Sequence, residues 1–400
     1  MRRLTCILAL LAVCLCTYAQ ELPTCARPED NCLLIPGEGL RIARFARRLK
    51  AVRESPDSSV TIWHIGGSHV QAGYFPSRLR TNFDSLGRYP ALGRGFIFPY
   101  PLAHSNYDRS YCISYEGEWL GSRSTLPNKH LPIKPRYGVM GIAAYTADTL
   151  AAFGLGTPRP FTRLRMMAEG SEGAAPLAIC GTDTLRFASD SLLKGYVAEF
   201  PGPVDSVRIE PGIADGGWFV ITGLLPEDDA RGGVRLVSTG VNGARTTTWL
   251  ERCPEFGRES ALICPDLMLL GLGINDSSCP AKDFKPEKFK ANYRKLLDII
   301  LSRNPQCALV FITNNDSYRY ARRRMVHNDN GPAVRKAMLE LAAEYDGAVW
   351  DLFEIMGGNG SAVRWMDAGL MKKDRLHFTA EGYRLLGDML YQALTEACDY

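Results

Sequence analysis

The feature that most constrains the fold of this chain is an alternation of strand and helix patterns. It occurs in two segments, and a segment with a different pattern separates them. The first has an amphipathic helix between Gly39 and Glu54, then a β-rich run, Val60–Ile65, that ends in two glycines. The second alternates buried strands with helices, at Leu267–Leu272, Pro286–Leu301, Ala308–Thr313, Pro332–Tyr345, Ala348–Leu352 and Ala380–Ala397. This alternation predicts a mostly parallel sheet with helices on both faces.

Residues 125–235 carry a different pattern. Short β-type runs are broken by Gly, Pro and Asp, at Tyr137–Tyr145, Phe161–Met167, Val197–Phe200, Val207–Ile209 and Trp218–Leu224. This pattern predicts an all-β sandwich, inserted into a discontinuous α/β domain of residues 20–124 and 236–400. Four aromatic residues of the insertion form either a sugar-stacking platform or, as is more usual, part of its core: Tyr145, Phe153, Phe161 and Trp218.

The N-terminus has the pattern of a secretory signal peptide. Arg2 and Arg3 precede an apolar stretch, Leu4–Cys16, and a small residue, Ala19, precedes the expected cleavage point. Residues 1–19 are therefore predicted to be removed from a bacterial protein that is periplasmic or faces the cell surface. A buried N-terminal helix is the alternative, but the basic start and the polar end fit export better.

Charge and hydropathy exclude two classes of partner. The formal net charge of the 400 residues is +4, and Arg2 and Arg3 supply two of these charges. This balance gives no reason to expect nucleic acid or an anionic membrane surface as a partner. No apolar run after residue 20 approaches the ~20 residues that a membrane span requires.

A serine lies where a nucleophile belongs in such a sheet. Ser68 directly follows the strand that ends at Gly66-Gly67 and precedes a helix. Ligands of open α/β sheets bind beyond the carboxyl ends of the strands, and a helix start offers N–H groups to a developing oxyanion. By itself, the same pattern also fits a serine that only caps a helix.

Three further segments supply the groups that a serine nucleophile needs. Asp374 and His377 precede the last helix and provide a base with an orienting carboxylate. Asn275 follows a buried strand and can donate its amide to an oxyanion, and Gly243 can add a backbone N–H. Taken singly, these segments also fit a capping loop and plain turns.

These four segments, in chain order, resemble the blocks of the SGNH (GDSL-type) hydrolase family. Ser68 matches the block I nucleophile, Gly243 the block II glycine and Asn275 the block III asparagine, while Asp374 and His377 match the Asp-x-x-His of block V. The resemblance implies a three-layer α/β fold and a Ser-His-Asp triad. It also implies an oxyanion hole of Ser68, Gly243 and Asn275, with no metal and no cofactor.

The resemblance has one departure and one narrower match. The family has Gly-Asp-Ser in block I, whereas this chain has Gly67 before the serine, which bears on the rigidity of the nucleophile loop. The Ser-His pair, the run Gly93–Phe96, the β insertion and the sequence Gly-Val-Asn-Gly-Ala are similar to bacterial peptidoglycan O-acetylesterases. In those proteins the insertion is a jelly-roll-like, carbohydrate-binding-like module.

Three further residues are predicted to contact substrate. His69 follows the nucleophile and lines the cleft or serves a structural hydrogen bond. Asn315 and Asp316 end a strand at the same sheet edge, where they contact substrate or, as is more usual, form a turn.

Three functions remain open from the sequence. The first is an exported esterase that removes O-acetyl groups from peptidoglycan. The second is the same chemistry on an acetylated glycan of a plant or a host. The third is a non-catalytic glycan-binding envelope protein, which the glycine at position 67 favours.

Overall fold

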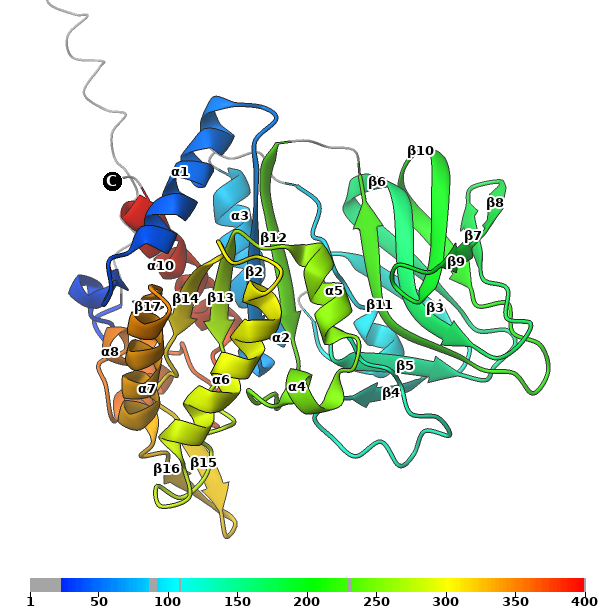
Figure 1. Cartoon of the computed structure of the whole chain (residues 1–400). Helices are drawn as coiled ribbons and strands as arrows, with labels where there is room; N and C mark the ends of the chain where they lie inside the picture. The colour runs from blue at the N-terminus through cyan, green and yellow to red at the C-terminus, as the bar shows by residue number, and fades with distance from the viewer. Residues whose placement is uncertain (1–22, 86–91, 108, 229–231, 399–400) are drawn as a thin grey trace, which may run out of the picture.

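The computed structural model describes residues 23–85, 92–107, 109–228 and 232–398, so the predicted signal peptide lies outside the described residues. Two sheets lie side by side (Figure 1). The first has six strands in the order β1-β17-β14-β13-β2-β12. Their bounds are β1 Leu33–Leu34, β2 Ser59–Gly66, β12 Gly233–Gly240, β13 Leu267–Gly271, β14 Ala308–Ile312 and β17 Ala348–Trp350. All pair in parallel except β1, which is antiparallel to β17.

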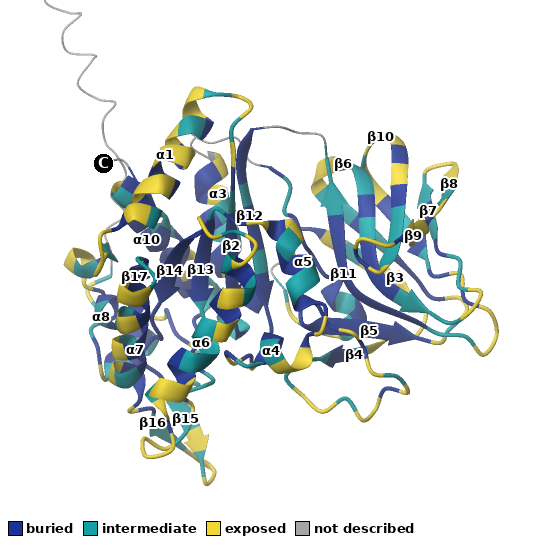
Figure 2. Ribbon diagram, viewed as in Figure 1, coloured by how far each residue is buried: buried dark blue, intermediate teal, exposed yellow. Residues whose placement is uncertain are grey.

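Helices cover both faces of this sheet, as the alternation predicts. One layer contains α1 (Leu40–Glu54), α3 (Tyr74–Ser85) and α10 (Ala380–Cys398); the other contains α5 (Phe256–Ile263), α6 (Pro286–Leu301) and α7 (Gly331–Glu344). Successive side chains of β13 alternate between the two layers. Leu267 and Leu269 pack with the first, and Met268 and Leu270 with the second. All four are fully buried, which is why this strand is an unbroken apolar run (Figure 2).

Shorter elements complete this part of the chain. The short helices are η1 Pro28–Asp30, α2 Ser68–Gln71, η2 Tyr100–Ala103, α4 Thr248–Arg252, α8 Leu352–Ile355 and α9 Ser361–Asp367. A hairpin of β15 (Tyr318–Ala321) and β16 (Arg324–His327) was not predicted from the sequence. Arg322 and Arg323 form its turn, and both have positive φ.

The second sheet has nine antiparallel strands in the order β4-β5-β11-β6-β10-β7-β8, with β3 paired to β6 and β9 to β10. Their bounds are β3 Cys112–Glu116, β4 Leu120–Arg123, β5 Ile142–Thr146, β6 Ala152–Gly170, β7 Leu177–Cys180, β8 Asp183–Arg186, β9 Ala188–Asp190, β10 Gly195–Glu210 and β11 Phe219–Glu227. The predicted strands 197–200 and 207–209 are one long strand. The register shifts between Glu199 and Ser206, where two prolines interrupt the ladder of hydrogen bonds.

The strand pairing moves both predicted boundaries of the insertion. The second sheet begins at Cys112 and not at residue 125, because β3 and β4 pair with β6 and β5. The side chains of β3 are mostly exposed, and the strand is only five residues long, so its pattern is a weak signal in the sequence. At the other end, the six-stranded sheet resumes at Gly233, three residues before position 236.

The four aromatic residues considered for a sugar platform belong to the core. Tyr145, Phe153 and Phe161 are buried, and Trp218 is half-buried against the same apolar cluster.

A buried carboxyl group joins the two sheets. Glu259 of α5 accepts a hydrogen bond from the backbone N–H of Val139, in the segment between β4 and β5, at 2.7 Å. The carbonyl of Val139 accepts a second bond from Trp249 Nε1 at 3.0 Å. Burial raises the pKa of Glu259 to about 8. The hydrogen bond from Val139 acts to lower this pKa, but the effect of burial is larger. Glu259 is therefore largely protonated in the folded protein at neutral pH.

This shift predicts a pH-dependent contribution to stability. The unfolded chain releases the Glu259 proton near pH 4.5, whereas the folded chain retains it up to about pH 8. Stability is therefore lost as pH rises through this interval, by at most ~1.4 kcal/mol per pH unit. The glutamine side chain of Glu259→Gln is neutral at every pH. The free energy of unfolding of this variant should therefore rise relative to that of the wild type as pH rises from 4.5 to 8.

Denaturant unfolding at several pH values measures this difference. Glu38→Gln, at an exposed loop position, should keep the wild-type dependence on pH. Parallel curves for wild type and Glu259→Gln would contradict the assignment of a protonated Glu259.

Candidate active site

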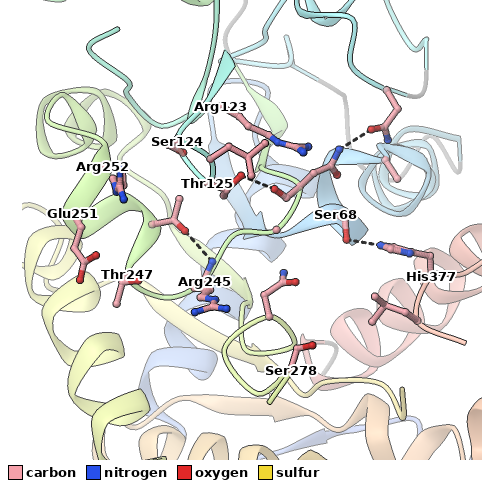
Figure 3. A pocket seen from close by; sticks show the side chains of 18 of the residues that line it. Ser68, Arg123, Ser124, Thr125, Arg245, Thr247, Glu251, Arg252, Ser278 and His377 are labelled. Atoms are coloured by element: carbon pink, nitrogen blue, oxygen red, sulfur yellow. Dashed lines mark hydrogen bonds between the residues drawn. The ribbon is translucent and has the colours of Figure 1, made fainter. Parts of the chain in front are cut away.

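A serine, a histidine and an aspartate form a continuous chain of hydrogen bonds at the carboxyl end of β2. Ser68 is the first residue of α2, directly after the turn at Gly67. Its Oγ lies 2.8 Å from Nε2 of His377 (Figure 3). Nδ1 of the same ring lies 2.8 Å from Oδ2 of Asp374. This geometry lets the imidazole accept the serine proton while the carboxylate holds the other ring nitrogen.

Asp374 also shapes the loop that carries the histidine. Its Oδ1 accepts the backbone N–H groups of Leu376 and His377, both at 3.0 Å. Burial opposes ionisation of Asp374, but the bonds from the imidazole and the two N–H groups outweigh it and hold the pKa below its ordinary range. The carboxylate therefore stays ionised and fixes the proton of His377 on Nδ1, which leaves Nε2 free to act as a base.

Asn315 and Asp316, two of the predicted substrate contacts, form hydrogen bonds within the protein. Asn315 donates to the carbonyl of Leu376 at 3.2 Å, so its amide holds the histidine loop. Asp316 is buried, with Oδ1 2.6 Å from His327 Nε2 and Oδ2 accepting the N–H of Ala362 at 2.9 Å. Neither residue lines the pocket beside Ser68, so the structure does not place them as substrate contacts.

His69, the third predicted substrate contact, is also directed away from the pocket. Its Nδ1 lies 2.7 Å from the hydroxyl of Tyr383 on α10. Burial, together with the nearby His377, lowers the pKa of His69 to about 3, so the ring is neutral. The structural alternative to a cleft-lining histidine is the one observed, and Tyr383 lines the pocket in its place.

The predicted oxyanion donors lie around the nucleophile. Asn275 Nδ2 donates one hydrogen bond to the carbonyl of Ala244 at 3.0 Å, and its second N–H is available. A Cβ at Gly67 would lie only 3.1 Å from this nitrogen, so the glycine leaves room for the Asn275 amide beside Ser68. Ser68, Gly243 and Asn275 all line the same pocket.

The segment that carries Gly243 is held from two sides. The N–H of Asn242 donates to Gln71 Oε1 at 2.7 Å, and its carbonyl accepts a bond from Thr125 Oγ1 at 2.8 Å. Gln71 belongs to α2 and Thr125 follows β4, so both sheets fix this turn. Gly243 has a φ of +83°, which favours glycine.

The triad opens into a pocket of about 940 Å³. The six-stranded sheet contributes Ser68, Asn275 and His377, and the segment after β4 contributes Ser124 and Thr125 (Figure 3). The pocket-lining residues that sequence reasoning missed are Asn106, Arg123–Leu126, Arg245, Thr247, Thr248, Glu251, Arg252, Ser278, Lys372 and Tyr383. These residues have no local motif, because only the packing of the two sheets brings them to one cavity.

The described part of the chain shows neither a metal cluster nor a membrane span. There, no group of three or more His, Cys, Asp or Glu side chains is arranged to hold a metal ion. Within the same ranges, no helix has the length and apolarity to cross a membrane.

A family model and solved structures match parts of this chain. The model of the GDSL-like Lipase/Acylhydrolase family matches residues 190–385, which include Gly243, Asn275, Asp374 and His377 but not the nucleophile position. A structure of a peptidoglycan O-acetylesterase aligns with a TM-score of 0.72 and 20% identity, covering 92% of this chain and 99% of that one. A search of curated protein sequences gives no significant match.

Other esterase structures align over less of the fold. An acetyl xylan esterase has 17% identity and a TM-score of 0.32, covering 40% of this chain and 81% of its own. A family two carbohydrate esterase from Cellvibrio japonicus has 12% identity and a TM-score of 0.29, covering 72% and 99%.

Over residues 190–385 the chain matches the GDSL-like lipase/acylhydrolase family, also named SGNH, as its sequence motifs indicated. Its enzyme class is that of a carboxylic ester hydrolase.

The position of Asn275 gives a kinetic prediction. Asn275→Ala should lower kcat for 4-nitrophenyl acetate by about 10²–10³-fold with little change in KM, because the lost donor acts on charge that develops in the transition state. Steady-state kinetics measure this, and Asn359→Ala at an exposed position is the matched control. A rise in KM with unchanged kcat would contradict a role in stabilising the oxyanion.

Proposed function

We propose that this protein is an exported serine esterase that removes O-acetyl groups from glycans, with peptidoglycan as its substrate. The observation that carries the proposal is the continuous chain of bonds from Ser68 through His377 to Asp374, with Ser68 facing a pocket of about 940 Å³. A pocket of this size accommodates sugar residues beside the acetyl group. A complete triad also favours catalysis over a purely binding role.

In the proposed reaction, Ser68 Oγ attacks the acetyl carbonyl carbon while Nε2 of His377 takes its proton. The N–H groups of Ser68 and Gly243 and the amide of Asn275 stabilise the tetrahedral oxyanion. The bond between carbonyl carbon and sugar oxygen then breaks, and His377 returns the proton to that oxygen. Water, deprotonated by His377, attacks the acetyl-serine, and acetate leaves as Ser68 regains a proton.

The second sheet is proposed to be a carbohydrate-binding-like insertion of sandwich type. Its strands run from Cys112 to Glu227, between β2 and β12 of the six-stranded sheet. The segment after β4 borders the pocket, so a glycan bound at Ser68 would contact both sheets. The likeness to a peptidoglycan O-acetylesterase spans 92% of this chain, and therefore both sheets.

Peptidoglycan is the proposed substrate because two independent features agree with it. The basic and apolar segment of residues 1–19 has the pattern of a signal peptide, which would deliver the enzyme to the compartment that contains the cell wall. The structure that aligns over almost its entire length is that of an enzyme acting on O-acetylated peptidoglycan.

Acetate release tests this function. The protein without residues 1–19 should release acetate from 4-nitrophenyl acetate and from O-acetylated peptidoglycan. Ser68→Ala should lower both rates by several orders of magnitude, because the nucleophile is lost. Ser189→Ala, at an exposed position of β9, is the matched control.

The outcomes separate the chemistry from the substrate. Release from the small ester alone would keep the serine esterase and assign it another acetylated glycan. An unchanged rate in Ser68→Ala, or no release by the folded wild type from either compound, would contradict the proposed function.

A further inference from the structure

The active-site pocket is strongly cationic. Four basic side chains line it, Arg123, Arg245, Arg252 and Lys372, against a single acidic side chain, that of Glu251. The chain as a whole is almost balanced, with 47 basic and 43 acidic residues. The charge of the pocket therefore reflects where the fold places these residues and not the composition.

Within the described residues, none of these four cations has a carboxylate at ion-pair distance. Several arginines elsewhere in the structure are paired with carboxylates. Arg165 bonds Asp190 and Glu227, and Arg208 bonds Glu116 through two nitrogens. The pocket thus holds guanidinium groups whose donors remain free for a ligand.

Arg123 and Arg245 come from different sheets and have fixed backbones. Arg123 is the last residue of β4 in the nine-stranded sheet. The next residue, Ser124, donates its backbone N–H to the carbonyl of Gly141 at 2.9 Å, which fixes the backbone at this point. The N–H of Arg245 donates to Thr248 Oγ1 at 2.9 Å, two residues after the oxyanion-hole glycine. Arg123 is half-buried and Arg245 exposed, so both can meet a ligand that enters from solvent.

The charges differ in their position relative to the nucleophile. In Figure 3, Glu251 and Arg252 lie on the opposite side of the pocket from Ser68. Arg123 and Arg245 lie between those two regions. The negative charge of Glu251 is therefore remote from the reacting ester, and the two arginines lie between it and Ser68.

A guanidinium group binds a carboxylate through two parallel hydrogen bonds, and such bonds are stronger than those to neutral hydroxyls. A neutral acetylated glycan would leave this capacity unused. Building on the proposed esterase function, we propose that Arg123 and Arg245 form a carboxylate subsite that selects acetylated glycans with a carboxylate close to the acetylated sugar. Two sources supply that group: the carboxylates of the peptides of peptidoglycan, and uronic acids of other polysaccharides.

Chemically matched substrates test the subsite. The two polymers are O-acetylated peptidoglycan and acetylated galacturonan. Each polymer is assayed in two forms, one with free carboxylates and one with the same carboxylates blocked as methyl amides. The readout is the ratio of kcat/KM for acetate release between the free and the blocked form. The wild type should favour the free form of one polymer by about 10- to 100-fold, the factor that a charge-assisted hydrogen bond supplies. The polymer with the higher ratio identifies the source of the carboxylate.

Variants and salt make the test specific. Arg123→Gln and Arg245→Gln should each lower the ratio at least about tenfold, mainly through KM. Arg186→Gln, which removes an exposed cation of β8, should keep the wild-type ratio. Raising sodium chloride from 0.05 to 0.5 M should lower the wild-type ratio, and this measurement requires no folded variant.

The results distinguish failure of the subsite from failure of the esterase. A wild-type ratio near one, or an unchanged ratio in both arginine variants, would overturn the subsite while acetate release still supports the enzyme. Hydrolysis of 4-nitrophenyl acetate without release from any of the four polymers would also overturn it. Absence of release from every compound would reject the proposed function and the subsite together.

Discussion

The hydrogen bond between Ser68 Oγ and His377 Nε2 joins residues 309 positions apart, and the packing of two helices maintains it. Helix α3 follows the nucleophile and α10 follows the histidine. A Cβ at Gly387 would lie 2.7 Å from the side chain of Arg78, so the glycine permits the helices to approach closely. Arg78 Nε and Asn82 Nδ2 both donate to Asp388 Oδ1 at 2.6 Å, which fixes the position of one helix along the other.

The parallel sheet places the remaining groups around this bond. β2, β12 and β13 are neighbours and end at one edge, where Ser68, Gly243 and Asn275 follow them. Because the ends of parallel strands meet at one edge, each loop needs to supply only one group. The nine-stranded sheet then closes the pocket with the segment after β4. Val139 and Glu259 hold the two sheets together, so the shape of the pocket depends on a buried protonated carboxyl group.

Sequence was most informative where a local pattern determines local structure. The amphipathic spacing of α1 and the apolar runs of β13 and β14 predicted elements within one residue or two of those observed. The short, mostly exposed strand β3 was not predicted, because its pairing with β6 defines it and its own side chains do not.

The same distinction holds at the site. The residues of the predicted triad carry motifs, and the structure brings them together. Asn315 and Asp316 were predicted to face substrate because they end a strand at the correct edge, but hydrogen bonds to distant residues turn them inward. Arg123 and Arg245 were not predicted as site residues, since no pattern shows that β4 packs beside the loop after β12.

Labelling with a serine-reactive fluorophosphonate tests the central claim most directly. The account predicts one covalent adduct per molecule, found by intact mass spectrometry and located by peptide mapping at Ser68. The adduct should be absent in Ser68→Ala and form far more slowly in His377→Ala, which retains the nucleophile but lacks its base. No adduct on the folded wild type, an adduct at another residue, or equally fast labelling of His377→Ala would contradict an activated serine at this position.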